Sequence, residues 1–215
     1  MMIRSFLSIF GIVWLTACGL VPVVTKTESA SAVDPSTRAE AMKLTSPVLV
    51  VGYRMALDEQ QAMETALVEA LADRKVMAYR SLDLFPPTRE WTEAEQRAVA
   101  AQRGIRQIIM AVPVTKDTDN LYVPPTYVPG QTYTQGSWMG NTYTATTYTT
   151  PGYVAGGYTV SRPVGIYGIT VFTPDDKRRW MARVMARGST AANFNTVAGG
   201  AAREAVKRLV ADGLL

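Results

Sequence analysis

The chain has 215 residues, no histidine and one cysteine, and its formal net charge is +4. The absence of histidine removes the commonest general base and the commonest transition-metal ligand. The single cysteine excludes an internal disulfide and a zinc site built on paired cysteines. A charge this small gives no electrostatic reason to expect a nucleic-acid partner. With 47% hydrophobic and 19% charged residues, the composition is typical of a globular protein of one domain with extensions.

The amino terminus has the pattern of a secretory signal. A basic residue precedes the apolar run Phe6–Leu15, and small residues follow before Cys18. The segment Leu15–Gly19 resembles the lipobox of bacterial lipoproteins. This resemblance implies a signal peptide at residues 1–17 and acyl chains, palmitate among them, on Cys18, and several such chains anchor a protein stably. Two alternatives stay open: an ordinary signal peptide with an incidental cysteine, or a membrane-spanning segment over residues 5–24.

The residues after the signal lack any periodic pattern. Residues 18–45 are rich in Thr, Ser, Ala and Pro, which predicts a flexible tether between the membrane and a folded domain. No aspartate stands at position 19 or 20. By the lipobox resemblance, this implies sorting to the outer membrane, with the protein on its periplasmic face.

Residues 46–215 predict one α/β domain of the α+β kind, with a mixed sheet of about five strands and helices packed on it. Buried strands are indicated by continuous apolar runs, helices by apolar residues three and four apart, and a half-buried strand by strict alternation over 180–187. Capping boxes are predicted at Asp58–Gln61 and Thr92–Glu95. The expected elements are strands at 47–53, 76–84, 105–114, 164–173 and 180–187, helices at 58–74 and 92–103, and a last helix capped by Asn195 or Thr196. The order is therefore βαβαβ, a long insert at about 121–161, and ββα.

Three of these segments carry a second resemblance. The strand Pro47–Tyr53, the entry Gly104–Ile109 and the strand Trp180–Gly188 with its closing helix are similar to small envelope lipoproteins with a TolB-amino-terminal-like α/β domain. The likeness covers most of residues 46–215 and rests on pattern. It implies a role in binding or assembly and brings no functional residues with it, since a shared fold is a weak guide to function.

The insert at 121–161 is the most unusual part of the chain. Its 41 residues include no charged side chain, and they hold seven of the ten tyrosines and three Thr-Tyr-Thr motifs. Thr and Tyr favour strands, whereas the glycines and prolines interrupt them. We therefore expect a long, irregular hairpin or loop, with extended arms and a mobile, Gly-rich tip around 131–147. A loop of this length is commonly functional or disordered. The side chains expected to meet a partner are Tyr133, Trp138, Tyr143, Tyr148, Tyr153 and Tyr158.

Three roles are open for the insert. Tyrosine combined with Gly, Ser and Thr suits a docked envelope protein. Exposed rings also suit stacking on wall glycan such as peptidoglycan. A low-complexity loop or a self-associating edge would need no single ligand. The last four tyrosines are five residues apart, which places successive rings on opposite faces of a straight strand and counts against one stacking row. The sequence favours protein docking.

No common catalytic motif is present: the chain lacks a nucleophile elbow, a phosphate-binding loop, a dinucleotide fingerprint and a zinc-protease motif. Gly165–Gly168 fits close packing within a strand, and Asp175–Asp176 fits a solvated turn. The cations within Lys177–Arg187 fit a solvated strand face, with a surface for anionic lipid as the alternative. We therefore expect no enzymatic activity, no metal and no cofactor.

Overall fold

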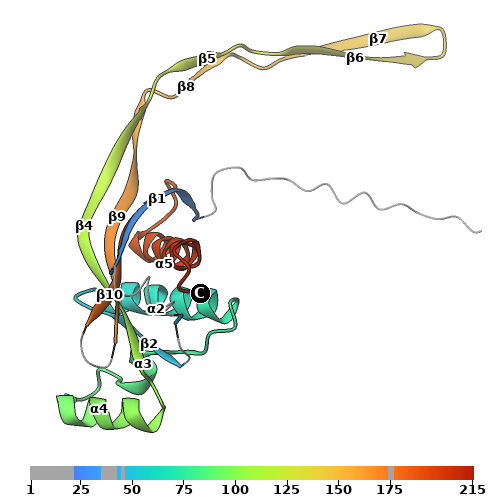
Figure 1. The fold of residues 1–215 in the computed structure, drawn as a ribbon. Coiled ribbons are helices and arrows are strands. Elements are labelled where there is room, and N and C mark those ends of the chain that lie inside the picture. The colour runs from blue at the N-terminus through green and yellow to red at the C-terminus, as the bar shows by residue number, and fades with distance from the viewer. Residues whose placement is uncertain (1–21, 35–42, 45–46, 174–176) are drawn as a thin grey trace, which may run out of the picture.

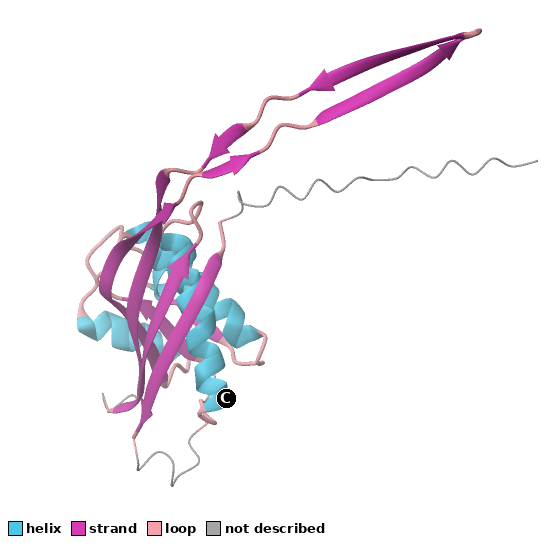
Figure 2. Cartoon of the chain, turned by 90° about the horizontal axis from the view of Figure 1, so that it is seen from above, coloured by secondary structure: helices cyan, strands magenta, loops and turns pink. Residues whose placement is uncertain are grey.

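The computed structural model describes residues 22–34, 43–44, 47–173 and 177–215. Six strands form one mixed sheet in the order β1-β10-β9-β4-β2-β3, and α2 and α5 pack on one of its faces (Figures 1 and 2). The domain is therefore α+β, as the sequence predicts. The elements in these residues are β1 (Val24–Val33), β2 (Val48–Gly52), α2 (Leu57–Ala72), β3 (Ala78–Arg80), α3 (Ser81–Leu84), α4 (Glu93–Gln102), β4 (Gln107–Val123), β5 (Thr126–Val128), β6 (Thr132–Met139), β7 (Thr142–Thr149), β8 (Tyr153–Ala155), β9 (Tyr158–Phe172), β10 (Arg178–Gly188) and α5 (Phe194–Ala211).

The hydrophobic core lies between the sheet and the two long helices. Every second residue of β9 from Tyr167 to Val171, and of β10 from Trp180 to Ala186, enters it, which confirms the alternation predicted for 180–187. Small residues of α5 let this helix approach the sheet closely, and a Cβ atom added to Gly200 would overlap with the side chain of Val24 on β1. The buried side chains of β9 and β10 are Tyr167, Ile169, Val171, Trp180, Ala182, Val184 and Ala186.

The prediction of a flexible tether over 18–45 is wrong for Val24–Val33. These residues form β1, an edge strand antiparallel to β10, so the sheet has six strands. Thr27 and Ser29 on β1 donate hydrogen bonds to the carboxylate of Glu204 on α5, at 3.2 and 3.1 Å. The strand escaped prediction because its central inward side chains, Thr27, Ser29 and Ser31, are hydroxyls that meet charged residues of α5, so the strand has no apolar alternation.

Two helix starts also differ from prediction. The capping box expected at Asp58 does not form, since α2 begins at Leu57 without a side-chain cap. Asp58 instead accepts a hydrogen bond from Asn195 Nδ2 at 3.0 Å, which joins α2 to α5. The last helix is capped by Asn193, whose side chain accepts from the Thr196 N–H at 3.0 Å, and not by Asn195 or Thr196.

The strand predicted at 76–84 is only three residues long. β3 ends at Arg80, and the short helix α3 follows directly. The change of conformation is fixed by Glu64 of α2, whose carboxylate accepts from the Ser81 hydroxyl at 2.6 Å and the Leu82 N–H at 3.1 Å. The strand thus ends where Ser81 contacts Glu64, 17 positions earlier in the chain. The local sequence does not reveal this contact.

β4 and β9 are longer than predicted and run together out of the domain. Their antiparallel pairing extends from Ile108 opposite Phe172 to Val123 opposite Tyr158. Pro113 is tolerated inside β4 because the register shifts between Pro113 and Thr115, as a β-bulge does. Beyond the last pair, the chain continues through β5, β6, β7 and β8 as a projection that stands far from the helices (Figure 1). We call residues 124–157 the arm.

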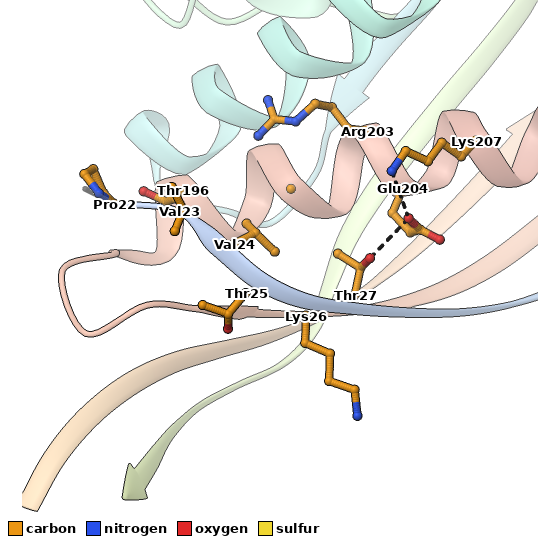
Figure 3. A pocket seen from close by; sticks show the side chains of 11 residues that line it. Pro22, Val23, Val24, Thr25, Lys26, Thr27, Thr196, Arg203, Glu204 and Lys207 are labelled. Atoms are coloured by element: carbon orange, nitrogen blue, oxygen red, sulfur yellow. Dashed lines mark hydrogen bonds and ion pairs between the residues drawn. The ribbon is translucent and has the colours of Figure 1, made fainter. Parts of the chain in front are cut away.

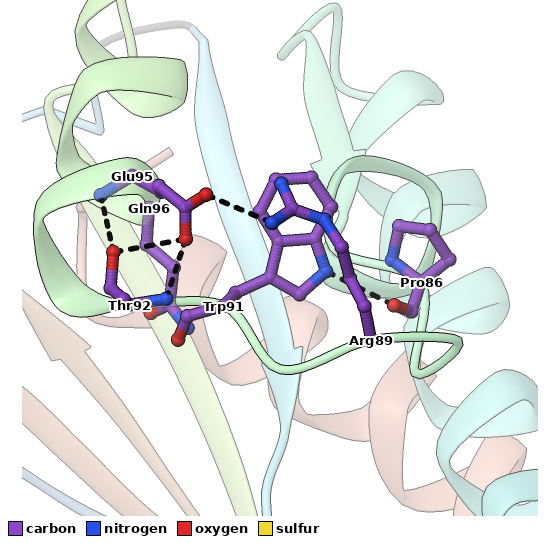
Figure 4. A network of polar contacts seen from close by, with 6 residues as sticks. All are labelled: Pro86, Arg89, Trp91, Thr92, Glu95 and Gln96. Atoms are coloured by element: carbon purple, nitrogen blue, oxygen red, sulfur yellow. Dashed lines mark hydrogen bonds and ion pairs between the residues drawn. The ribbon is translucent and has the colours of Figure 1, made fainter.

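Helix α4 starts from a polar corner (Figure 4). The predicted capping box at Thr92–Glu95 is confirmed: Thr92 Oγ1 accepts from the Glu95 N–H at 3.3 Å, and Glu95 accepts from the Thr92 N–H at 2.8 Å. Arg89 Nη1 lies 2.8 Å from Glu95 Oε1, and its guanidinium carbon lies 3.6 Å from the centroid of the Trp91 ring. The Trp91 indole N–H donates to the Pro86 carbonyl at 3.1 Å.

This corner lowers the pKa of the Glu95 carboxyl. Its pKa is lowered from 4.5 to about 2, first by the hydrogen bond from Arg89 and then by the donors of Thr92. Because the folded pKa lies below the unfolded one, the contribution to stability is complete above about pH 4.5 and is lost as the pH falls toward 2. An NMR titration of the Glu95 carboxyl should give this value. Arg89→Ala should raise the pKa, whereas the control Arg97→Ala should leave it unchanged, and a wild-type pKa near 4.5 would contradict the prediction.

Candidate functional site: the projecting arm

Two joints divide the arm into successive two-stranded ladders. At the first, Pro124–Pro125 lies opposite Gly156–Gly157, and at the second, Pro129–Gly130 lies opposite Pro151–Gly152. Proline cannot donate to a ladder, and Gly156, with φ of +96°, has a conformation that favours glycine. Each joint therefore interrupts both strands at the same level, as the interruptions in the sequence predict.

The sequence predicts an irregular hairpin or loop with a Gly-rich tip, and the tip of the arm is a regular hairpin. β6 and β7 pair without a register shift from Thr132 opposite Thr149 to Met139 opposite Thr142, and Gly140 closes the turn with φ of +61°. Gly136 does not break β6 because the ring of Tyr143 covers it, and a Cβ atom added there would overlap with the Tyr143 hydroxyl. Aromatic cover of a strand glycine in this way restores side-chain packing.

The two faces of this hairpin differ. On one face, Thr–Thr hydrogen bonds join 132 to 149 (3.3 Å) and 134 to 147 (3.1 Å), and the Trp138 and Tyr143 rings lie 5.1 Å apart. On the other, Tyr133 and Tyr148 stack with ring centroids 5.5 Å apart. All these rings are exposed, with Trp138 at 70%, so the arm presents aromatic pairs to its surroundings.

The six predicted partner-binding residues do not form a single site. Four of them make the two ring pairs of the tip, on opposite faces. Tyr153 lies in β8 opposite Val128, between the two joints, and Tyr158 lies opposite Val123 at the end of the β4–β9 ladder. The predicted lipidation residue, Cys18, and the Asp175–Asp176 turn lie outside the described residues.

A buried polar cluster fixes the root of the arm. Glu59 of α2 is 2% exposed, accepts a hydrogen bond from the Tyr167 hydroxyl at 2.7 Å and lies 2.9 Å from Lys116 Nζ. Lys116 belongs to β4 and Tyr167 to β9, so one carboxylate holds both strands that lead into the arm. Burial and the neighbouring Glu59 raise the pKa of Tyr167 above its ordinary value, which keeps the phenol a hydrogen-bond donor.

A second carboxylate, Glu64, is fully buried beside the carboxyl ends of the parallel strands β2 and β3. It accepts four hydrogen bonds, from the Gly52 N–H (2.9 Å), Gln60 Nε2 (2.8 Å), the Ser81 hydroxyl (2.6 Å) and the Leu82 N–H (3.1 Å). The ends of parallel strands are a common place for ligands. Glu64, however, is enclosed and saturated by these donors, so its role is to join α2, β2 and α3.

The sequence analysis missed both buried carboxylates. For Glu64 a signal existed: it follows Met63 and precedes Leu67 by three positions, inside the apolar stripe of the helix. A charged residue in such a stripe needs a partner. For Glu59 no local signal existed, because its partner Lys116 is 57 residues away.

An open hollow lies between β1 and α5 (Figure 3). Two of its polar side chains already pair with Glu204: Thr27 donates to its carboxylate at 3.2 Å, and Lys207 Nζ lies 3.7 Å from it. Among the described residues, no group of three or more His, Cys, Asp or Glu side chains is placed to hold a metal ion. Over the same residues, no helix is both apolar and long enough to cross a membrane.

Comparison with known proteins gives distant structural neighbours. No protein-family model and no curated protein matches the chain. The PelC dodecamer from Paraburkholderia phytofirmans is 12% identical, with a TM-score of 0.46, over 86% of this chain and 97% of that one. A point variant of that dodecamer is 11% identical, with a TM-score of 0.43 over the same shares. Likeness at this level assigns neither a function nor an assembly to this chain.

The geometry predicts that the arm is dispensable for folding. Replacing residues 124–157 by Asn-Gly should close β4 and β9 at the Val123–Tyr158 pair with a two-residue turn. We call this variant the short-arm chain. Its free energy of unfolding should stay within about 0.5 kcal/mol of the parent, because surface changes that leave the core intact have effects of this size.

A denaturant titration measures both free energies of unfolding, and Glu64→Leu is the contrasting variant in it. It leaves buried donors without an acceptor, at about 1–3 kcal/mol for each group, so a loss of at least about 3 kcal/mol is expected. A short-arm chain as unstable as Glu64→Leu would contradict the separation of arm and core.

Proposed function

We propose that this protein is a non-catalytic envelope lipoprotein, anchored through Cys18, that docks a protein partner with its arm. The observation that carries the proposal is the tip of the arm: a regular hairpin without charge, exposed on both faces, held well away from the domain (Figure 1). An exposed hairpin with aromatic pairs and no core of its own has the features of a recognition element.

The chemistry of the tip suits a protein partner in two ways. Tyrosine, tryptophan and methionine are the side chains enriched in protein interfaces, and Trp138 and Met139 are the most exposed large side chains of the tip, at 70% and 75%. The backbone edges of β6 and β7 also offer hydrogen bonds to an added strand. No charged side chain of the arm would have to be desolvated on binding.

If Cys18 is lipidated as proposed, the position of β1 sets how the domain would stand relative to the membrane. If Cys18 is the lipidated residue, only Gly19–Val23 separates it from β1, and a chain of that length reaches about 20 Å at most. β1 starts at Val24, opposite Gly188, and its neighbour Arg187 lies opposite Val164 at the root of the arm. The proposed anchor and the arm therefore leave the same end of the sheet, and the arm adds a reach of roughly 55 Å at 3.3 Å per residue from Val123 to Gly140.

We propose the periplasmic face of an outer membrane as the location, on the strength of the lipobox resemblance. Glycan binding is the alternative role, and it has less support because the aromatic rings are divided between two faces of the hairpin. Four rings in two opposed pairs offer no continuous row for a sugar chain.

The test of docking is affinity capture after crosslinking in intact cells, with the full chain and the short-arm chain compared at equal abundance in the membrane. The full chain should capture a defined envelope protein, further copies of this chain included, and the short-arm chain should lose it. The control Gln102→Ala, on the exposed helix α4, should capture the same partner as the parent. Equal capture by all three chains would show that the partner binds the domain and not the arm. Recovery of peptidoglycan alone would favour the alternative role.

The test of anchoring is Cys18→Ala. Without its lipid attachment, the protein should leave the membrane pellet and appear in the soluble periplasmic fraction. Cys18→Ala in the short-arm chain should behave in the same way, because the prediction assigns anchoring to the lipid and not to the arm. A Cys18→Ala chain that stays in the membrane would refute the lipid anchor.

A further inference from the structure

Both long edges of the tip hairpin are open. The ladder of β6 and β7 has two strands, so each strand leaves one row of N–H and C=O groups unpaired by the described chain. Every residue of both strands is exposed. A lone two-stranded hairpin is at best marginally stable in water. Further strands beside it would add hydrogen bonds and cover its side chains.

The edges of the main sheet are protected, in contrast. β3 has only three residues, and β1 carries Lys26 and Glu28 on the face away from α5. Short length and charge are common means of preventing edge-to-edge pairing. β6 and β7 have neither device: they contain no charge, no proline and no bulge over eight residues each. Among the described strands, β6 and β7 thus offer long open edges that carry none of these protections.

The sequence of the tip already pairs with its own repeat. Thr132-Tyr133-Thr134 of β6 lies directly opposite Thr147-Tyr148-Thr149 of β7. The threonine hydroxyls are hydrogen-bonded across the strands and the tyrosines stack. Cross-strand pairs of these kinds stabilise a sheet. A second copy of the chain supplies the same motif in the same conformation.

Strand geometry permits two copies to pair in the register of the hairpin. In an antiparallel ladder, residues alternate between pointing their backbone groups at one neighbour and at the other. Residues that face each other in the hairpin therefore also present compatible backbone groups on the outer edges of β6 and β7. β7 of one copy can pair with β6 of the next in the existing register, with Thr149 opposite Thr132 and Tyr148 opposite Tyr133. By contrast, two β7 strands cannot place Tyr143 opposite Tyr148, since these side chains lie on opposite faces.

We propose that the arm binds the arm of a second copy, with β7 of one chain antiparallel to β6 of the next in the register of the hairpin itself. This inference rests on the proposed docking function and names its partner. Each copy uses a different edge for each neighbour, so the contact is heterologous and continues from chain to chain.

The experiment uses two full-length, membrane-extracted chains with different tags, one carrying Thr132→Cys and the other Thr149→Cys. They are made separately and together, then treated with a short thiol crosslinker. Co-expression should give a species at twice the mass of one chain that carries both tags, and neither variant alone should give it. Thr134→Cys with Thr147→Cys is the second pair and should behave alike. The matched control, Arg97→Cys with Gln102→Cys on α4, measures random collision.

Each result decides the proposal. A crosslink confined to the mixed pairs supports it. Equal crosslinking of a single variant with itself would show like-to-like strand pairing and overturn it. A mixed yield no higher than the α4 control would also overturn it, as would an unchanged oligomeric mass when the full chain is compared with the short-arm chain by sedimentation.

Failure here is distinguishable from failure of docking. If the mixed pairs do not crosslink but the arm still captures another envelope protein, only the identity of the partner is wrong. If neither occurs, the arm is not a docking element at all.

Discussion

The antiparallel ladder between β4 and β9 is the constraint on which the rest of the structure depends. Its first half is part of the core, where Ile109 and Ala111 of β4 and Ile169 and Val171 of β9 are buried against the helices. Its second half carries the arm. The bulge at Pro113–Thr115 marks the change, and beyond it β4 carries polar and charged residues, such as Asp119 opposite Arg162. One pair of strands therefore forms part of the core and also carries the arm. Any shift of its register would disturb both the core packing and the position of the arm.

Glu59 is what secures this ladder to the helices. A buried carboxylate is costly unless it is paired and hydrogen-bonded, and Glu59 meets both conditions through Lys116 and Tyr167. Because the two partners come from different strands, the cluster fixes β4 and β9 together against α2. Glu64 uses the same principle without a cation, since hydrogen-bond donors saturate it. These two carboxylates of α2 thus position the arm root and α3 through directional contacts that apolar packing alone would not provide.

The sequence predicted those features whose cause is local. The alternation of β10, the capping box at Thr92 and the interruption of the insert by Pro–Gly pairs all follow from a few neighbouring residues. The larger failures have causes in other elements of the fold. β1 is polar on its inner face because Glu204, 175 residues away from Ser29, receives its hydroxyls. The tip is regular because Tyr143 covers Gly136 from the opposite strand. The aromatic side chains of the candidate site were identified from sequence, but their division into opposed pairs needed the register.

The two joints explain how the arm can be attached to the main sheet and yet not follow the twist of that sheet. At each joint, proline removes donors and glycine allows the strands to come close, so the regular ladder is interrupted on both strands together. Hydrogen bonding then resumes in a separate two-stranded sheet. The tip is therefore not forced to continue the twist of the main sheet, which would otherwise accumulate along one uninterrupted ribbon. Neighbouring tips need a common direction in order to pair edge to edge. If tips pair as proposed, the interrupted ladders would allow that alignment without requiring the domains beneath them to adopt the same spacing.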